Sequence, residues 1–201
     1  MKRSIHSFII LSVCLSFSSA ISAEANSPVI VRKGETYELV LPPAIKKTLA
    51  QFNSRFKTWQ ATDYALEVRH GGHQEKFNNR APFALITDIN GDGITDLILD
   101  GHDDKKNLLL GIVSKASKYT VTVIRESDRG DPQTLNNEFE GKKQKGLAYY
   151  LWLEEKRKPG RPLFSLAWPQ QTSRSGELLG DGGVVQYHFK DGKFEEETIE
   201  M

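Results

Sequence analysis

One nine-residue segment constrains this chain more than any other, the stretch from Asp88 to Asp96 with the sequence DINGDGITD. Oxygen-bearing side chains stand at alternating positions, Asp88, Asn90 and Asp92, and Asp96 closes the segment. The two glycines between them allow the tight turn that brings such side chains together. This spacing, D-x-N-x-D-G-x-x-D, is typical of a calcium-binding loop.

Calcium binds about six to eight oxygen atoms. The predicted ligands are the carboxylates of Asp88, Asp92 and Asp96, the side-chain amide of Asn90 and the backbone carbonyl of Ile94. Three carboxylates this close would repel one another without a cation. The alternative interpretation, two plain hairpin turns at the Asn-Gly and Asp-Gly pairs, explains the glycines but not four oxygen ligands in register.

The residues beside the loop predict strands rather than the helices of an EF-hand. Residues 83–86 (FALI) precede the loop and residues 97–99 (LIL) follow it. The twelfth position is Leu99, where an EF-hand carries a bidentate glutamate. We therefore expect a hydrated strand–loop–strand site with a dissociation constant on the order of 10⁻⁵ to 10⁻³ M. His102, Asp103 and Asp104 follow closely, and they either add a ligand or form a solvated turn.

The segment 82–99 (PFALITDINGDGITDLIL) resembles the FG-GAP, or VCBS-type, repeat of integrin-type β-propellers and many secreted bacterial proteins. The resemblance implies a calcium ion held between two strands by the loop ligands named above. It covers roughly 20 to 30 of the 201 residues. Propellers need several blades, and the chain has one copy, so we expect no complete propeller. The chain is also similar to small exported bacterial proteins with a single repeat.

The N-terminus predicts a signal peptide over residues 1–23. Two basic residues precede a short apolar core at 8–17, and small residues follow at 18–23. Cleavage is expected after Ala20 or Ala23. The apolar run is shorter than the about 20 residues of a membrane span. We therefore expect a periplasmic or secreted protein without a stable span after cleavage; the alternatives are a retained N-terminal anchor and a lipid on Cys14.

The mature domain is expected to lack thiols, because Cys14 is the only cysteine of the chain. Its core must then stabilise it without disulfides, with a metal as the additional source of stability. Removal of the signal leaves 25 of the 27 basic residues against 26 acidic ones. This near balance argues against a nucleic acid as partner. The size of residues 24–201 fits one domain.

The remaining pattern predicts an α+β fold, mainly antiparallel β with one N-terminal amphipathic helix. That helix is expected over residues 44–56, where Ile45, Leu49, Phe52 and Phe56 form one apolar stripe. Asp191-Gly192 predicts a hairpin turn, and the polar residues 127–146 predict a long surface loop. Strands are expected at 29–31, 37–41, 64–68, 82–87, 97–100, 108–113, 119–125, 147–153, 163–168, 183–190 and 193–199.

No motif gathers the residue types that catalysis requires. A hydrolase needs a nucleophile–base pair or paired carboxylates. Residues 175–177 (SGE) do not form a nucleophile elbow. His70 and His73 flank two glycines, a pattern that favours a flexible turn over a metal site.

We therefore expect an exported, non-catalytic domain that binds one calcium ion, with the metal mainly structural. Two alternatives stay open. The first is a cell-envelope protein-interaction or inhibitor module, with an envelope protein or glycan as partner. Its surface would combine the aromatic stretch 149–152 with Trp168 and Pro169, residues that alternatively belong to core strands. The second is a calcium-dependent hydrolase.

Overall fold

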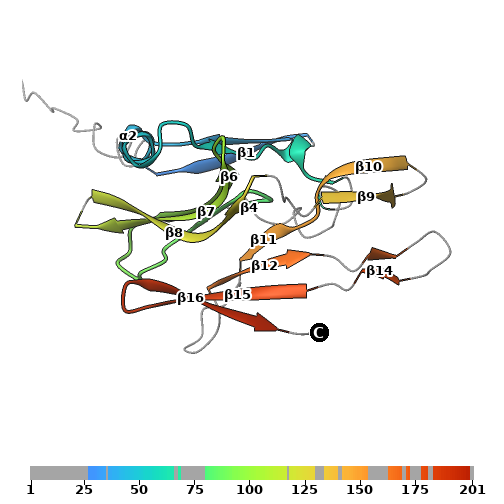
Figure 1. The fold of residues 1–201 in the computed structure, drawn as a ribbon. Coiled ribbons are helices and arrows are strands. Elements are labelled where there is room, and N and C mark those ends of the chain that lie inside the picture. Colours follow the sequence, from blue (N-terminus) through green and yellow to red (C-terminus); the bar gives the residue numbers. More distant parts are fainter. Residues whose placement is uncertain are drawn as a thin grey trace, which may run out of the picture.

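A computed structural model describes most of the chain after the predicted signal peptide (Figure 1). The described residues are 27–34, 36–65, 68, 80–116, 118–129, 134–139, 142–153, 163–168, 171–172, 178–180 and 183–199. The signal peptide, its cleavage sites and the pair His70 and His73 lie outside them.

A six-stranded antiparallel sheet forms the centre of the fold. Its main path runs β4-β5-β6-β7-β8, and β3 pairs with the end of β6. The strands are β3 (Lys57–Thr58), β4 (Arg80–Ala81), β5 (Ala84–Thr87), β6 (Asp96–His102), β7 (Lys106–Lys115) and β8 (Lys118–Asp128). Strand β6 is buried from its first residue to Gly101, which indicates that both faces of the sheet are covered.

One face of this sheet packs against the N-terminal elements. These are a hairpin of β1 (Val29–Lys33) and β2 (Thr36–Val40) and the helix α2 (Pro43–Phe52). Leu97 and Leu99 of β6 belong to the same buried cluster as Ile45 and Leu49 of α2. The helix has a proline in its first turn, where a missing N–H costs nothing.

The helix ends four residues before the predicted boundary. Asn53 has an extended backbone conformation, and its N–H donates to the Leu49 carbonyl. Phe52 is 41% exposed rather than part of the buried stripe. The prediction of helix as far as Phe56 was therefore wrong, although Phe56 still packs against the core from the following segment.

A second antiparallel sheet covers the opposite face of the central sheet. Its order is β11-β12-β15-β16, from β11 (Tyr150–Leu153), β12 (Phe164–Trp168), β15 (Gly183–Lys190) and β16 (Lys193–Ile199). Leu85 and Ile98 of the central sheet share a cluster with Phe164 and Tyr187 of the second. A Cβ on Gly111 would lie 2.5 Å from the Phe194 ring, so the close approach of the two sheets requires glycine there.

Two hairpins test the turn predictions. Asp191 and Gly192 join β15 to β16 with φ angles of 51° and 80°, as the Asp-Gly signal predicts. The predicted loop over 127–146 was wrong, because it contains the antiparallel pair β9 (Thr134–Phe139) and β10 (Lys142–Leu147). The pattern missed this pair because most of its residues are polar and its few apolar residues, such as Leu135 and Phe139, do not form a recognisable alternating run.

The described part is mainly antiparallel β with one α-helix, and its sheets form neither a closed barrel nor a propeller. Short elements complete it: the 3-10 helix η1 (Ala61–Asp63), β13 (Gln171–Thr172) and β14 (Leu178–Gly180). The described residues of the predicted strand at 64–68 do not form a strand, because Tyr64 makes an isolated parallel bridge with Leu147, Ala65 is irregular and Val68 is helical. Within the described residues no helix has the length and apolar character to cross a membrane.

Candidate metal centre

The predicted calcium loop connects β5 to β6 at one end of the central sheet. Its ends are held together because Thr87 pairs directly with Asp96 in the antiparallel register. Gly91 and Gly93 have φ angles of 77° and 80°. Residues other than glycine rarely adopt this backbone conformation, which accounts for a glycine at each position.

Side-chain oxygens of the loop fold its backbone by accepting amide hydrogen bonds. The Asp88 carboxylate accepts from Gly91 N–H at 2.7 Å and from Gly93 N–H at 3.0 Å. The Asn90 Oδ1 accepts from Asp92 N–H at 3.0 Å. These are the turns that aspartate and asparagine form with the backbone that follows them. The loop is therefore ordered by the same oxygen atoms that the spacing predicts as ligands.

Asp96 is fully buried and its carboxylate is bonded by the backbone on three sides. Its Oδ2 accepts from Ile89 N–H at 2.8 Å and from Asn90 N–H at 3.4 Å. Its Oδ1 accepts from Ser114 N–H at 2.7 Å. A carboxylate offers about four lone pairs, so these three bonds leave Asp96 about one lone pair for an ion.

Ser114, near the end of β7, is the residue that sequence reasoning missed. Its hydroxyl donates to the Asp92 carboxylate at 3.0 Å, and its carbonyl accepts from Asn90 Nδ2 at 2.7 Å. Together with its amide bond to Asp96, these contacts fix the loop to β7. A serine 18 positions from Asp96 carries no signal of this role, because only the sheet register brings the two together.

The electrostatics of the loop favour an ionised Asp92. The hydrogen bond from the Ile94 amide is the main cause that lowers the pKa of Asp92, and bonds from Asn90 and Ser114 act in the same direction. Tyr119 lies nearby and donates its hydroxyl to the Thr95 carbonyl at 3.4 Å. Burial raises the pKa of Tyr119, and the charges of Asp96 and Asp92 add to this effect.

The described residues contain no group of three or more His, Cys, Asp or Glu side chains arranged to hold a metal together. The remaining donors are the oxygens of Asp88, Asn90 and Asp92 and the carbonyl of the exposed Ile94. The Asp88 Oδ1 accepts from the Gly91 amide and the Oδ2 from the Gly93 amide, so lone pairs remain for a cation. Oxygen donors of this kind suit a hard ion such as calcium.

The acidic residues after β6 are not brought to the loop. The seven residues of β6 separate the two ends by about 20 Å. Asp103 accepts from the amides of Lys105 and Lys106, and these bonds lower its pKa to about 2. The His102 ring packs on Trp59 with 4.3 Å between the ring centroids. The segment 102–104 therefore forms a turn at the opposite end of the sheet.

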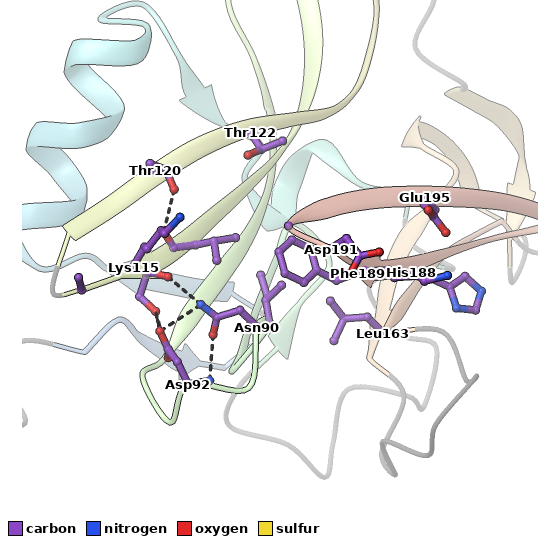
Figure 2. A pocket seen from close by; sticks show the side chains of 16 residues that line it. Asn90, Asp92, Lys115, Thr120, Thr122, Leu163, His188, Phe189, Asp191 and Glu195 are labelled. Carbon is purple, nitrogen blue, oxygen red and sulfur yellow. Dashed lines mark hydrogen bonds between the residues drawn. The ribbon is translucent and has the colours of Figure 1, made fainter.

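A groove of about 1160 Å³ lies beside the loop. One wall comes from the loop and from β7 and β8, and the other comes from the β15–β16 hairpin (Figure 2). Asn90 and Asp92 line the groove, so two of the predicted calcium ligands also form part of its wall.

Comparison with known proteins gives no match, since no family model, no curated protein and no solved structure is similar to the chain at a significant level. The likeness to an FG-GAP repeat therefore stays a prediction based on residues 82–99.

Proposed function

We propose that this protein is an exported, non-catalytic domain that binds one calcium ion in the loop 88–96, and that the metal is mainly structural. The observation that carries the proposal is the ordered set of oxygens at Asp88, Asn90 and Asp92. These oxygens accept hydrogen bonds from backbone amides of the loop. The bonds fold the loop into one short turn that carries all three side chains. We assign the Ile94 carbonyl as a further ligand.

Within this site Asp96 supports the loop and contributes at most one further oxygen. Its three amide bonds join residues 89, 90 and 114, so it fixes the loop to two strands. Ser114 adds the bond to Asp92. An ion bound to the loop would stabilise this connection between β5, β6 and β7.

The size of that stabilisation follows from mass action. Free calcium at ten times the dissociation constant contributes about 1.4 kcal/mol to the free energy of unfolding. The Asp88 and Asp92 carboxylates belong to the same short loop and repel each other, and a bound ion would offset this repulsion. Exported proteins meet calcium at concentrations that suit weak sites of this type.

Thermal unfolding tests the proposal directly. We expect the Tm of the protein to rise from EGTA to 10 mM calcium, and to rise less in 10 mM magnesium, which binds reluctantly to such loops. The double variant Asp88→Ala/Asp92→Ala should lose the response. Asp104→Ala is a matched control, because Asp104 makes an exposed ion pair with Arg55 at the other end of the sheet. An unchanged wild-type Tm in EGTA and in calcium would refute the proposal.

A further inference from the structure

We propose that the groove between the loop 88–96 and the β15–β16 hairpin binds a neutral oligosaccharide. This inference rests on the proposed function, because a calcium ion in the loop would form one end of the binding site. The groove is a different structure from the metal loop, and its lining side chains determine what it can hold.

The dimensions of the groove favour an extended ligand. Its volume of about 1160 Å³ exceeds the roughly 300–1,000 Å³ of pockets that enclose one small molecule. Its two walls belong to different sheets. Thr122 and Lys115 lie on the side of β7 and β8, whereas Phe189 and Glu195 lie on the side of the hairpin (Figure 2). A chain of linked rings can contact both walls at once.

The charges of the groove favour an uncharged ligand. Outside the loop, the ammonium groups of Lys115 and Lys190 are matched by the carboxylates of Asp191 and Glu195. A polyanion would meet the two acids, and a polycation would meet the two lysines. Like charges brought together in this way oppose binding. The lining instead supplies donors and acceptors in similar number.

Sugar hydroxyl groups match this arrangement because each can donate and accept a hydrogen bond. Lys115 and Lys190 offer donors, Asp191 and Glu195 offer acceptors, and the exposed Thr122 hydroxyl can do both. A sugar ring also has an apolar C–H face. The half-buried Phe189 and the buried Leu163 line the groove and provide an apolar surface for that face.

The calcium loop joins the groove through Asn90 and Asp92, which line both. A loop with few protein ligands leaves water on the ion. Two neighbouring sugar hydroxyls could replace such waters, because the ion accepts any hard oxygen donor. Calcium would thus both order this wall and contact the ligand, so we expect binding of the sugar to depend on calcium.

Calorimetry with the full chain tests the inference. The probes are xylotriose, cellotriose, mannotriose and maltotriose, with trigalacturonate as the charged comparison, each in 5 mM calcium and in EGTA. We expect at least one neutral trisaccharide to bind in calcium, with a Kd at least about tenfold weaker in EGTA. Phe189→Ala should weaken binding by about tenfold while the calcium-induced rise in Tm is retained.

Phe189 packs on Phe194 with ring centroids 4.9 Å apart, so its replacement carries a risk of misfolding. The exposed Glu195→Ala provides the second variant, and we expect it also to weaken sugar binding. Lys106→Ala, at the far end of the central sheet, is the control and should bind like the wild type.

Each remaining outcome overturns the inference in a recognisable way. A normal calcium-induced rise in Tm without binding of any neutral trisaccharide refutes the inference and leaves the proposed function intact. Binding of trigalacturonate alone refutes the neutral class of ligand. Sugar binding that is equal in calcium and in EGTA refutes the role of the ion, and an unchanged Tm in calcium refutes the proposed function itself.

Discussion

Asp96 and Asp100 lie four residues apart on strand β6 and are both buried, yet their carboxyl groups have different partners. Asp96 accepts three backbone N–H groups, from Ile89, Asn90 and Ser114. Asp100 accepts the Tyr64 hydroxyl at 3.0 Å. Burial raises the pKa of Asp100 to about 7, against the opposing effect of hydrogen bonds from Tyr64, Tyr149 and the Gly101 amide.

The comparison teaches that burial alone does not decide what an acid on this strand does, because the two buried carboxyl groups have different partners. Backbone amides cannot leave, so Asp96 is part of the framework that closes the loop. Burial favours the neutral form of Asp100 and raises its pKa to about 7. Its hydroxyl partners can turn and serve a neutral or a charged carboxyl group. The first aspartate fixes the site, whereas the second makes the core sensitive to pH.

The largest effect is expected from removing the Asp96 carboxylate. Asp96→Ala leaves three amides without their acceptor, two of them in fully buried contacts. Hydrogen bonds to a charged group contribute about 1.5–3 kcal/mol each, so the free energy of unfolding should fall by about 3–5 kcal/mol. Urea unfolding measures this. A loss below about 1 kcal/mol would remove the distinction between the two aspartates.

The next effect concerns Asp100 and depends on pH. Its folded pKa of about 7 lies above the usual unfolded value near 3.9. Protonated Asp100 therefore makes its full contribution to the free energy of unfolding below about pH 4, and this contribution is lost as the pH rises through about 7. Between pH 5 and pH 8 the titration of Asp100 should lower the free energy of unfolding of the wild type by on the order of 2 kcal/mol.

Asp100→Asn isolates this contribution because asparagine keeps similar shape and hydrogen bonds without a titrating proton. We expect the variant to lose less stability than the wild type between pH 5 and pH 8, measured by urea unfolding at each pH. Parallel pH profiles would show that Asp100 does not titrate in this range. The positive charge of Arg125 lowers the pKa of Asp100, so Arg125→Gln should raise that pKa and increase the loss of stability between pH 5 and pH 8.

A smaller effect is expected in the loop backbone. Gly93→Ala meets no atom within 4 Å, but φ there is 80°. An alanine in the left-handed region costs roughly 1–2 kcal/mol, and we expect Tm to fall accordingly. Thr95→Ala in the same loop is the control, and an equal change in both variants would argue against backbone strain.

The smallest effect is expected from Ser114→Ala. The change removes the hydroxyl bond to Asp92 but keeps the amide bond to Asp96 and the carbonyl bond to Asn90. A hydrogen bond to a charged group contributes about 1.5–3 kcal/mol when it is buried, and the contribution is smaller here because Asp92 is exposed. We expect stability in EGTA to change by less than about 1 kcal/mol and the Kd for calcium to increase by a few-fold. An effect as large as that of Asp96→Ala would show that the hydroxyl, not the amide, fixes the loop.

The sequence was sufficient where the signal is local. The Asp191-Gly192 hairpin and the strands around the loop follow from turn chemistry and alternation of apolar residues. It was insufficient where contacts are remote or patterns are polar. Ser114 reaches the loop only through the register of β6 with β7, and the sequence of the β9–β10 pair is too polar to show a run of alternating apolar residues. The resemblance of residues 82–99 to a calcium repeat remains untested by these features.

A crystal structure of the protein grown in 10 mM calcium tests the central claim most directly. The proposed site predicts one anomalous density peak in the loop 88–96, bonded to oxygens of Asp88, Asn90 and Asp92 and to the Ile94 carbonyl at about 2.3–2.6 Å. The groove side of the ion should carry water. An ordered loop with only water at that position, at a calcium concentration far above the expected dissociation constant, would contradict the claim.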